Sequence, residues 1–219
     1  TYSGTGSAAT LPHGLGTSDI GMIIVKRLNA LSSWRVYHKS LGATKSLQLD
    51  TTDPAGTDDS WNDTEPTSTL FSVGTANETN NASGTYVAYV FADVKGYSHM
   101  GSYEGNGDNT PDGPFVYTGF KPSFVMIKNA SSVLNWTTRD NARDTYNPGY
   151  NYIYPNLNNA GTNHGPPVTS GGTYALQFLA NGFKPDATDT KINEDQSTFV
   201  YAAFGQTMVG TNGVVGTAR

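Results

Sequence analysis

The chain has 219 residues, a formal net charge of −5 and no cysteine. This length allows one large domain or two small ones, and the missing thiols exclude disulfides, thiolate zinc sites and cysteine nucleophiles. Only 14% of the residues are charged, no run of basic residues exists and no apolar run reaches membrane-spanning length, so neither nucleic-acid binding nor membrane insertion is expected.

The first half of the chain predicts strands separated by turns rich in glycine, asparagine and proline. Residues 20–28 form a continuous apolar run, which is typical of a buried strand. Residues 34–39 alternate between two kinds of side chain, the period-two pattern of a strand with unlike faces. Residues 50–69 are a long polar loop that contains six acidic residues and Trp61. Further strands are predicted within 1–19, around Leu47 and Leu49, at 70–73 and at 85–94.

The second half follows the same order. Its loop 158–172 is rich in Asn, Gly and Pro instead of acidic residues. Helical periodicity is nearly absent, and only residues 173–180 fit one or two turns of helix. Asn181 and Gly182 predict a tight turn, because both residues tolerate positive φ. Strands are predicted at 124–128, 136–140, 150–157, 174–183 and 198–204.

An internal repeat relates the two halves. Residues 85–91 match 198–204 without a gap, and the glycine-flanked stretch 96–101 is the expected seam. We therefore predict an all-β fold of two tandem β-sandwich units, of jelly-roll or immunoglobulin-like topology. The first unit comprises residues 1–100, and the second comprises 101–219 with a C-terminal tail. The other matched positions are Tyr2 with Tyr103, Gly4 with Gly105, Gly6 with Gly107 and Trp34 with Trp136.

Specific sequence motifs are distributed along nearly the whole chain. They include Trp-Arg-Val-Tyr-His-Lys at 34–39, Gly-Thr-Tyr-Val-Ala-Tyr-Val-Phe-Ala at 84–92, Gly-Ser-Tyr-Glu-Gly-Asn-Gly at 101–107 and Asp-Gly-Pro-Phe-Val-Tyr-Thr-Gly-Phe-Lys-Pro at 112–122. Together they resemble an uncharacterised domain that is common in tailed-bacteriophage virion proteins. The resemblance implies a structural protein, often the C-terminal part of a tail, fibre or spike chain, and no catalytic residues. The family usually has an acidic residue after its Phe-Ala, whereas this chain has Phe204-Gly205-Gln206.

The tryptophans give two different expectations. Trp34 and Trp136 stand at one repeat position after a buried strand, so both are expected to pack in the core or on a strand face. Trp61 lies in the polar loop and has no counterpart in the second half. Its ring beside carboxylates and amides fits sugar recognition, and a loop anchor packed on the sandwich is the alternative. The candidate ligand-binding residues are Trp61, Asn62, Asp63, Asp58 and Asp59.

No catalytic residue, metal site or cofactor is predicted. The acids of the loop 50–69 match no calcium-loop spacing, so a solvated loop is expected. The four histidines lack zinc-ligand spacing. Asp140 and Arg143 are expected to form an ion pair that pins the turn after a strand. Glycoside hydrolysis needs two facing carboxylates, and only the scattered Glu104, Glu194 and Asp195 are candidates.

These patterns favour a non-enzymatic virion structural protein, such as a tail fibre, spike or other surface component. It would lie on the particle surface and act in assembly and in attachment to a host glycan or protein. Other virion proteins and further copies of the chain are the expected partners, with a homotrimer as the commonest state of fibres. Loops on a rigid scaffold carry specificity, so the loops 50–69 and 158–172 are the expected carriers. The alternatives are a carbohydrate-directed depolymerase and a purely architectural decoration protein.

Because the chain begins with Thr, we expect a processed product or a piece of a longer polypeptide.

Overall fold

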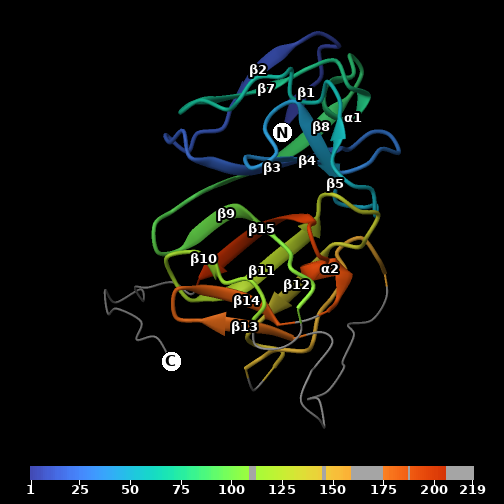
Figure 1. The fold of residues 1–219 in the computed structure, drawn as a ribbon. Helices are drawn as coiled ribbons and strands as arrows, with labels where there is room; N and C mark the ends of the chain where they lie inside the picture. Colours follow the sequence, from blue (N-terminus) through green and yellow to red (C-terminus); the bar gives the residue numbers. More distant parts are fainter. Residues whose placement is uncertain (109–111, 145–146, 159–174, 187, 206–219) are drawn as a thin grey trace. The chain divides into compact units, whose positions relative to one another are not determined.

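The computed structural model describes residues 1–108, 112–144, 147–158, 175–186 and 188–205 (Figure 1). This part of the chain is all-β, with antiparallel strands in several sheets, none of which closes into a barrel. The chain divides into two compact units, Thr1–Asp93 and Val94–Arg219. The predicted boundary between residues 100 and 101 lies inside a strand of the second unit, β9 (Ser98–Glu104). Gly101 lies within this strand opposite Tyr201, and the position favours glycine because a Cβ there would lie 2.6 Å from the Tyr201 hydroxyl oxygen.

The larger sheet of unit 1 has the strand order β1-β8-β3-β4-β5-β6. Its predicted buried strand is confirmed as β3, which pairs with β8 on one side and with β4 on the other. Six of the eight residues of β3 are buried, which explains its continuous apolar run. The strands are β1 (Tyr2–Ser3), β3 (Ile20–Arg27), β4 (Arg35–His38), β5 (Lys45–Gln48), β6 (Gly56–Thr57) and β8 (Thr85–Ala92).

A second sheet of two strands, β2 (Ala9–Pro12) and β7 (Leu70–Val73), shares a hydrophobic core with this larger sheet. Burial of each large side chain there contributes roughly 1.5–3 kcal/mol to folding. Unit 1 is therefore sandwich-like, with its core between the two sheets. The core includes Ile23, Val25 and Tyr37 from the large sheet and Phe71 and Val73 from the small one.

Unit 2 has a four-stranded sheet, β12-β11-β15-β9, and a three-stranded sheet, β10-β14-β13. Side chains of both sheets again meet in one core, in which Val125 and Phe199 face Phe183 and Leu176 from the other sheet. The strands besides β9 are β10 (Val116–Tyr117), β11 (Pro122–Asn129), β12 (Thr137–Asp140), β13 (Ala175–Leu179), β14 (Gly182–Asp186) and β15 (Thr198–Gly205).

The two units share a strand order and several contacts. The series β1-β8-β3-β4 in unit 1 corresponds to β9-β15-β11-β12 in unit 2. Tyr2 stacks on Tyr86 and Tyr103 stacks on Phe199, each with ring centroids 5.0 Å apart. The register of the central strand shifts near its start in both units, between Ile20 and Met22 and between Pro122 and Phe124. The sequence matches between the halves thus coincide with matching contacts inside each unit.

A one-turn helix precedes the last strand of each unit, and the sequence did not predict either one. Helix α1 (Asn77–Asn80) and helix α2 (Thr190–Asn193) have four residues each, which is too short for helical periodicity. Tyr2 donates a hydrogen bond from its hydroxyl to the Thr79 carbonyl oxygen at 2.6 Å, and Tyr103 donates to the Ile192 carbonyl oxygen at 2.7 Å. Each helix is therefore tied to the first strand of its unit.

Three expectations for the second half need correction or fall outside the described chain. Residues 150–157 form no strand, and Ile153 makes only an isolated bridge to Thr138. Residues 175–179, expected as helix or as the start of one long strand, form β13, which turns back into β14. The turn lies one residue before the predicted Asn181-Gly182 position, at Ala180 and Asn181, because Gly182 already pairs with Leu179 as the first residue of β14. Neither Asn181 nor Gly182 has a positive φ. The loop 158–172 lies outside the described residues apart from Asn158. Among the described residues, no helix is long and apolar enough to cross a membrane.

Candidate functional site

Trp61 is an interior residue of unit 1. Its side chain is 1% exposed and belongs to the core between the two sheets. The ring meets Tyr37 edge-on, with centroids 5.8 Å apart, and no hydrogen-bond partner reaches its buried indole nitrogen. A sugar cannot stack on a ring that has no exposed face, so the prediction that Trp61 takes part in sugar recognition is wrong. Trp61 instead anchors the loop 50–69 to the sandwich, as the alternative predicted.

Asn62 and Asp63 form the outer end of the same turn. Both are exposed, and both adopt the left-handed conformation, with φ of 52° and 46°, which asparagine and aspartate tolerate better than most residues. The Thr64 amide closes the turn by donating to the Trp61 carbonyl oxygen at 3.2 Å. The buried ring therefore holds a short exposed pair of polar side chains in a fixed position.

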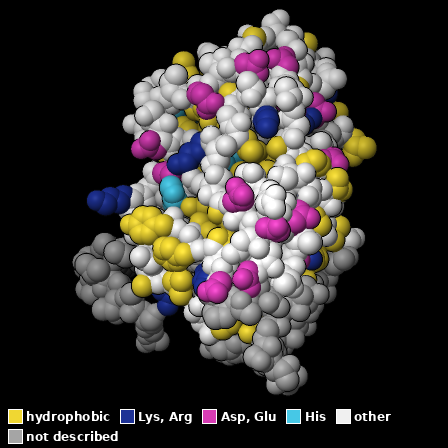
Figure 2. All heavy atoms as spheres, in the orientation of Figure 1, with side chains coloured by type: hydrophobic (Ala, Val, Ile, Leu, Met, Phe, Trp, Pro, Cys, Tyr) yellow, Lys and Arg dark blue, Asp and Glu magenta, His cyan; other side chains and the backbone are white. Residues whose placement is uncertain are grey.

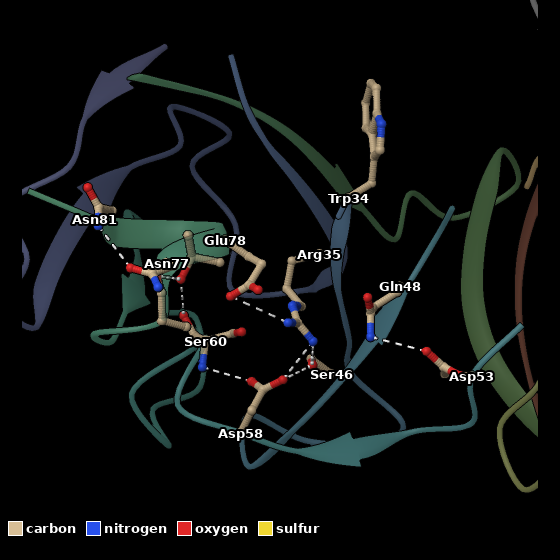
Figure 3. A network of polar contacts seen from close by, with 12 residues as sticks. Trp34, Arg35, Ser46, Gln48, Asp53, Asp58, Ser60, Asn77, Glu78 and Asn81 are labelled. Atoms are coloured by element: carbon tan, nitrogen blue, oxygen red, sulfur yellow. Dashed lines mark hydrogen bonds and ion pairs between the residues drawn. The ribbon is translucent and has the colours of Figure 1, made fainter. Parts of the chain in front are cut away.

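Arg35 is the centre of a polar network at the start of β4 (Figure 3). Its Nη1 donates to Asp58 Oδ2 at 2.9 Å, and its Nη2 lies 3.5 Å from Glu78 Oε2. Ser46, on the neighbouring strand β5, accepts from Arg35 Nη1 at 3.1 Å and donates to the same Asp58 oxygen. The Arg35 side chain is 13% exposed, so this contact between strand, loop and helix is largely shielded from water.

The network continues from Asp58 to α1. Asp58 Oδ1 accepts the Ser60 amide at 2.8 Å, and the Ser60 carbonyl oxygen accepts the Thr79 hydroxyl at 3.2 Å. Asn81, which follows α1, donates to the Asn77 side chain at 2.8 Å. Figure 3 shows Arg35 and Glu78 pointing toward each other, whereas the Trp34 ring points away from them. Of the five predicted ligand residues, only Asp58 takes part in this network. Arg35 and Glu78, which also belong to it, were not among the predicted site residues.

Other carboxylates of the loop are also engaged locally. Asp59 Oδ2 accepts the Thr75 amide at 2.6 Å and its hydroxyl at 2.5 Å, and these hydrogen bonds lower the pKa of the Asp59 carboxyl. Glu65 accepts the Tyr37 hydroxyl and the Ala43 amide. Burial, followed by the hydrogen bond to Glu65, raises the pKa of the Tyr37 phenol.

The arrangement has the chemistry of a loop whose carboxylates hold its own conformation. Five of the six carboxylates in the loop accept hydrogen bonds from nearby protein groups: Asp50, Asp53, Asp58, Asp59 and Glu65. Within the described residues, no group of three or more His, Asp or Glu side chains is placed to hold a metal ion. Acidic, basic and hydrophobic side chains are interspersed on the face shown in Figure 2. The loop therefore offers an exposed, ordered surface.

The remaining predicted structural residues take the following positions. The Trp34 amide donates to Asp50 Oδ1 at 3.0 Å and the Trp136 amide donates to Asn156 Oδ1 at 3.1 Å, so the two occupy corresponding places before β4 and β12. Trp136 is buried, whereas Trp34 is half-buried. The predicted ion pair between Asp140 and Arg143 is confirmed, and Asp140 Oδ1 also accepts the Arg143 amide at 2.9 Å.

A buried guanidinium in unit 2 was not predicted. Arg139, on β12, is 1% exposed and lies 4.7 Å from the centre of the Tyr152 ring. Its Nη1 donates to the Gly149 carbonyl oxygen at 3.4 Å, whereas Nε and Nη2 have no hydrogen-bond partner. Burial lowers the pKa of the Arg139 guanidinium to about 10. Arg139 pairs with Val125 in unit 2 as Tyr37 pairs with Ile23 in unit 1. Arg139 therefore takes the position that Tyr37 has in unit 1.

Comparison with known proteins places the whole arrangement in one family. A family model described as a domain of unknown function, DUF7483, matches residues 1–207. The chain belongs to this family. Because the match runs through both units, the DUF7483 domain comprises the pair and not a single unit. No curated protein and no solved structure matches the chain.

Replacing Arg35 with methionine is expected to lower the free energy of unfolding by about 2 kcal/mol, between the values for exposed and buried ion pairs. The reason is that Asp58 and Glu78 would lose their common counter-ion. Urea unfolding of Arg35→Met, Asp58→Asn and the double variant would measure the coupling. Arg143→Met is the matched control, because its pair with Asp140 is more exposed and a change below about 0.5 kcal/mol is expected. Equal losses in the two arginine variants would contradict the assigned role of Arg35.

Proposed function

We propose that this DUF7483 chain is a non-enzymatic structural protein of a tailed-phage virion, a tail fibre, spike or other surface component. It acts in assembly and in attachment to a glycan or protein of the host surface. The observation that carries the proposal is the state of the loop 50–69, in which buried Trp61 and locally bonded carboxylates hold an exposed turn. Such a loop is pre-organised for contact, and five of its carboxylates already serve its own conformation.

The architecture supports the same proposal. Two sandwich-like units with one strand order are what duplication of an ancestral β-sandwich would produce. Attachment sites usually lie on loops that a rigid scaffold positions. Asn62 and Asp63 are exposed at the end of the turn that Trp61 anchors. We therefore assign contact with the host surface to this turn, with other virion proteins and further copies of the chain as the partners in assembly.

Binding of the purified protein to a glycan microarray and to host cells tests the attachment role. The variant Asn62→Ala/Asp63→Ala removes the exposed side chains and leaves Trp61 in place. The matched control is Asp195→Ala/Gln196→Ala, which alters an exposed turn of unit 2 that also contains a left-handed residue, Gln196 with φ of 56°.

We expect the Asn62→Ala/Asp63→Ala variant to bind at least about tenfold more weakly than the wild type, equivalent to 1.4 kcal/mol. We expect the control to retain wild-type binding. Cleavage of any bound glycan would overturn the non-enzymatic assignment. Wild-type adsorption by the Asn62→Ala/Asp63→Ala variant would overturn the assignment of attachment to this turn.

A further inference from the structure

The outer face of the three-stranded sheet of unit 2 carries two exposed aromatic side chains. Phe115 is 51% exposed and Tyr117 is 63% exposed. Val116, which lies between them, points the other way and packs with Phe183 in the core, so Phe115 and Tyr117 lie on the outer face by alternation. Tyr117 stands opposite Gly182 on β14. A Cβ at Gly182 would lie 3.2 Å from Cε2 of Phe115, so the Phe115 ring lies against this glycine.

Unit 1 shows that the fold does not require these rings. Its strands β2 and β7 correspond to β10 and β14, because β7 and β14 each precede the one-turn helix of their unit. Register places Leu11 opposite Phe71 in unit 1 as it places Val116 opposite Phe183 in unit 2. The residues of unit 1 that take the positions of the two aromatic residues are Thr10 and Pro12. A sandwich-like unit therefore forms without aromatic side chains on this face.

Polar side chains lie on the same face beside the rings. Lys184 follows Gly182 by two residues on β14, and Gln177 on β13 lies opposite Lys184. Asp186 holds both of these side chains, since its Oδ2 accepts from Gln177 Nε2 and its Oδ1 lies 3.5 Å from Lys184 Nζ. Gln177 and Lys184 are half-buried. The face thus combines two aromatic rings with an amide and an ammonium group that a carboxylate holds in place.

The exposed aromatic surface is too small for a stable protein interface. A fully covered Phe or Tyr buries about 150–250 Å², so the exposed parts of Phe115 and Tyr117 together offer roughly 300 Å² at most. Each partner in a stable protein complex usually buries about 800 Å². A ligand that matches this face is therefore small, with apolar surface for the rings and polar groups for Gln177 and Lys184.

We propose that this face binds a neutral oligosaccharide built of hexopyranose units. The C–H groups on one side of a pyranose ring would stack on Phe115 or Tyr117, and the hydroxyl groups would hydrogen-bond to Gln177 and Lys184, which carry several donors and an acceptor. Alternate residues of a strand are about 7 Å apart, so the two rings suit neighbouring units of a sugar chain. Asp186 balances the charge of Lys184, which favours a neutral sugar over an acidic one. This site lies in unit 2 and does not depend on the attachment proposed for the turn of unit 1.

A microarray of glucose, galactose and mannose oligosaccharides tests the site in the full chain. The wild type is expected to bind at least one of them, and Phe115→Thr/Tyr117→Thr is expected to bind it at least about tenfold more weakly, because two ring contacts are lost. Phe115→Tyr/Tyr117→Phe keeps both rings and is expected to retain binding. Tyr89→Thr is the matched control, because it removes a tyrosine that is 47% exposed on strand β8 of unit 1. Threonine is well tolerated in strands, and an NMR spectrum with native dispersion would show that each variant folds.

Three results would overturn the proposal. The first is that the wild type binds none of these neutral oligosaccharides, or that Phe115→Thr/Tyr117→Thr binds them as well as the wild type does. The second is that the double threonine variant loses binding only to acidic glycans, which would contradict the neutral class. The third is a wild-type dimer that the double threonine variant dissociates in sedimentation, which would identify a second copy as the occupant. Neutral-glycan binding that Asn62→Ala/Asp63→Ala abolishes and the double threonine variant retains would refute this site and leave the proposed attachment through the turn intact.

Discussion

Trp61→Ala is expected to lower the free energy of unfolding of unit 1 by about 4 kcal/mol, within the range for truncation of a buried aromatic side chain. The indole is 1% exposed and contacts the core that both sheets share, so its removal leaves a cavity that surrounding strands cannot easily close. Chemical denaturation followed by circular dichroism would measure the loss.

Two variants separate packing from surface recognition. Trp61→Phe keeps an aromatic ring and removes an indole nitrogen that has no hydrogen-bond partner, so it is expected to recover more than half of the loss. Trp34→Ala is the matched control, because Trp34 is half-buried and its truncation is expected to cost less. A Trp61→Ala protein of native stability that no longer bound a glycan would contradict the anchor role and support sugar recognition by Trp61 instead.

Strands with strong local signals could be predicted from the sequence. The apolar runs of β3 and β11 and the matched pair β8 and β15 identified the central strands of both units, because a strand covered on both faces needs apolar residues throughout. The strand β9 was missed because Gly96 and Gly101 are typical of a linker. The requirement for Gly101 comes instead from Tyr201 across the sheet, a contact that no local pattern contains.

The candidate site was predicted less completely, for a similar reason. Polar neighbours made Trp61 look exposed, whereas its burial depends on Tyr37 and on a core assembled from distant strands. Arg35 and Glu78 are 43 positions apart in the sequence, and only the packing of α1 against the larger sheet, at β3, brings them together. Arg139 was missed because arginine is normally a surface residue. Repeat alignment, which places Arg139 at the position of Tyr37, is the signal that could have identified it.

Asn80→Ala and Asn193→Ala are expected to lower the free energy of unfolding of their own units by about 3 kcal/mol each, because each removes several hydrogen bonds of one buried side chain together. Asn80 Oδ1 accepts the Thr5 amide at 2.7 Å, and Asn80 Nδ2 donates to the Ser7 and Gly74 carbonyl oxygens at 2.6 and 2.7 Å. The side chain is 1% exposed. Its hydrogen bond to Gly74 is buried, so that carbonyl oxygen would be left without its donor, whereas Thr5 and Ser7 are exposed.

Asn193 makes the corresponding contacts in unit 2. Its Oδ1 accepts the Asn106 amide at 3.0 Å, and its Nδ2 donates to the Asp108 carbonyl oxygen at 3.0 Å. Its own carbonyl oxygen accepts the Gly107 amide at 3.0 Å, as that of Asn80 accepts the Gly6 amide at 2.9 Å. In both units, therefore, one buried asparagine at the end of a one-turn helix holds the segment that follows the first strand. These shared contacts predict losses of similar size in the two units.

Unit-resolved amide hydrogen exchange would measure each loss separately, because two units need not unfold in one transition. Ser83→Ala and Thr188→Ala are controls at exposed positions near α1 and α2, and changes below about 0.5 kcal/mol are expected for them. Asn→Asp at either position puts a carboxylate oxygen against carbonyl oxygens that now accept an amide hydrogen, so it is expected to destabilise at least as much as alanine. A large loss for Asn80→Ala beside a negligible one for Asn193→Ala would show that the two asparagines do not play the same role, and the proposed descent of both units from one sandwich would lose its strongest structural support.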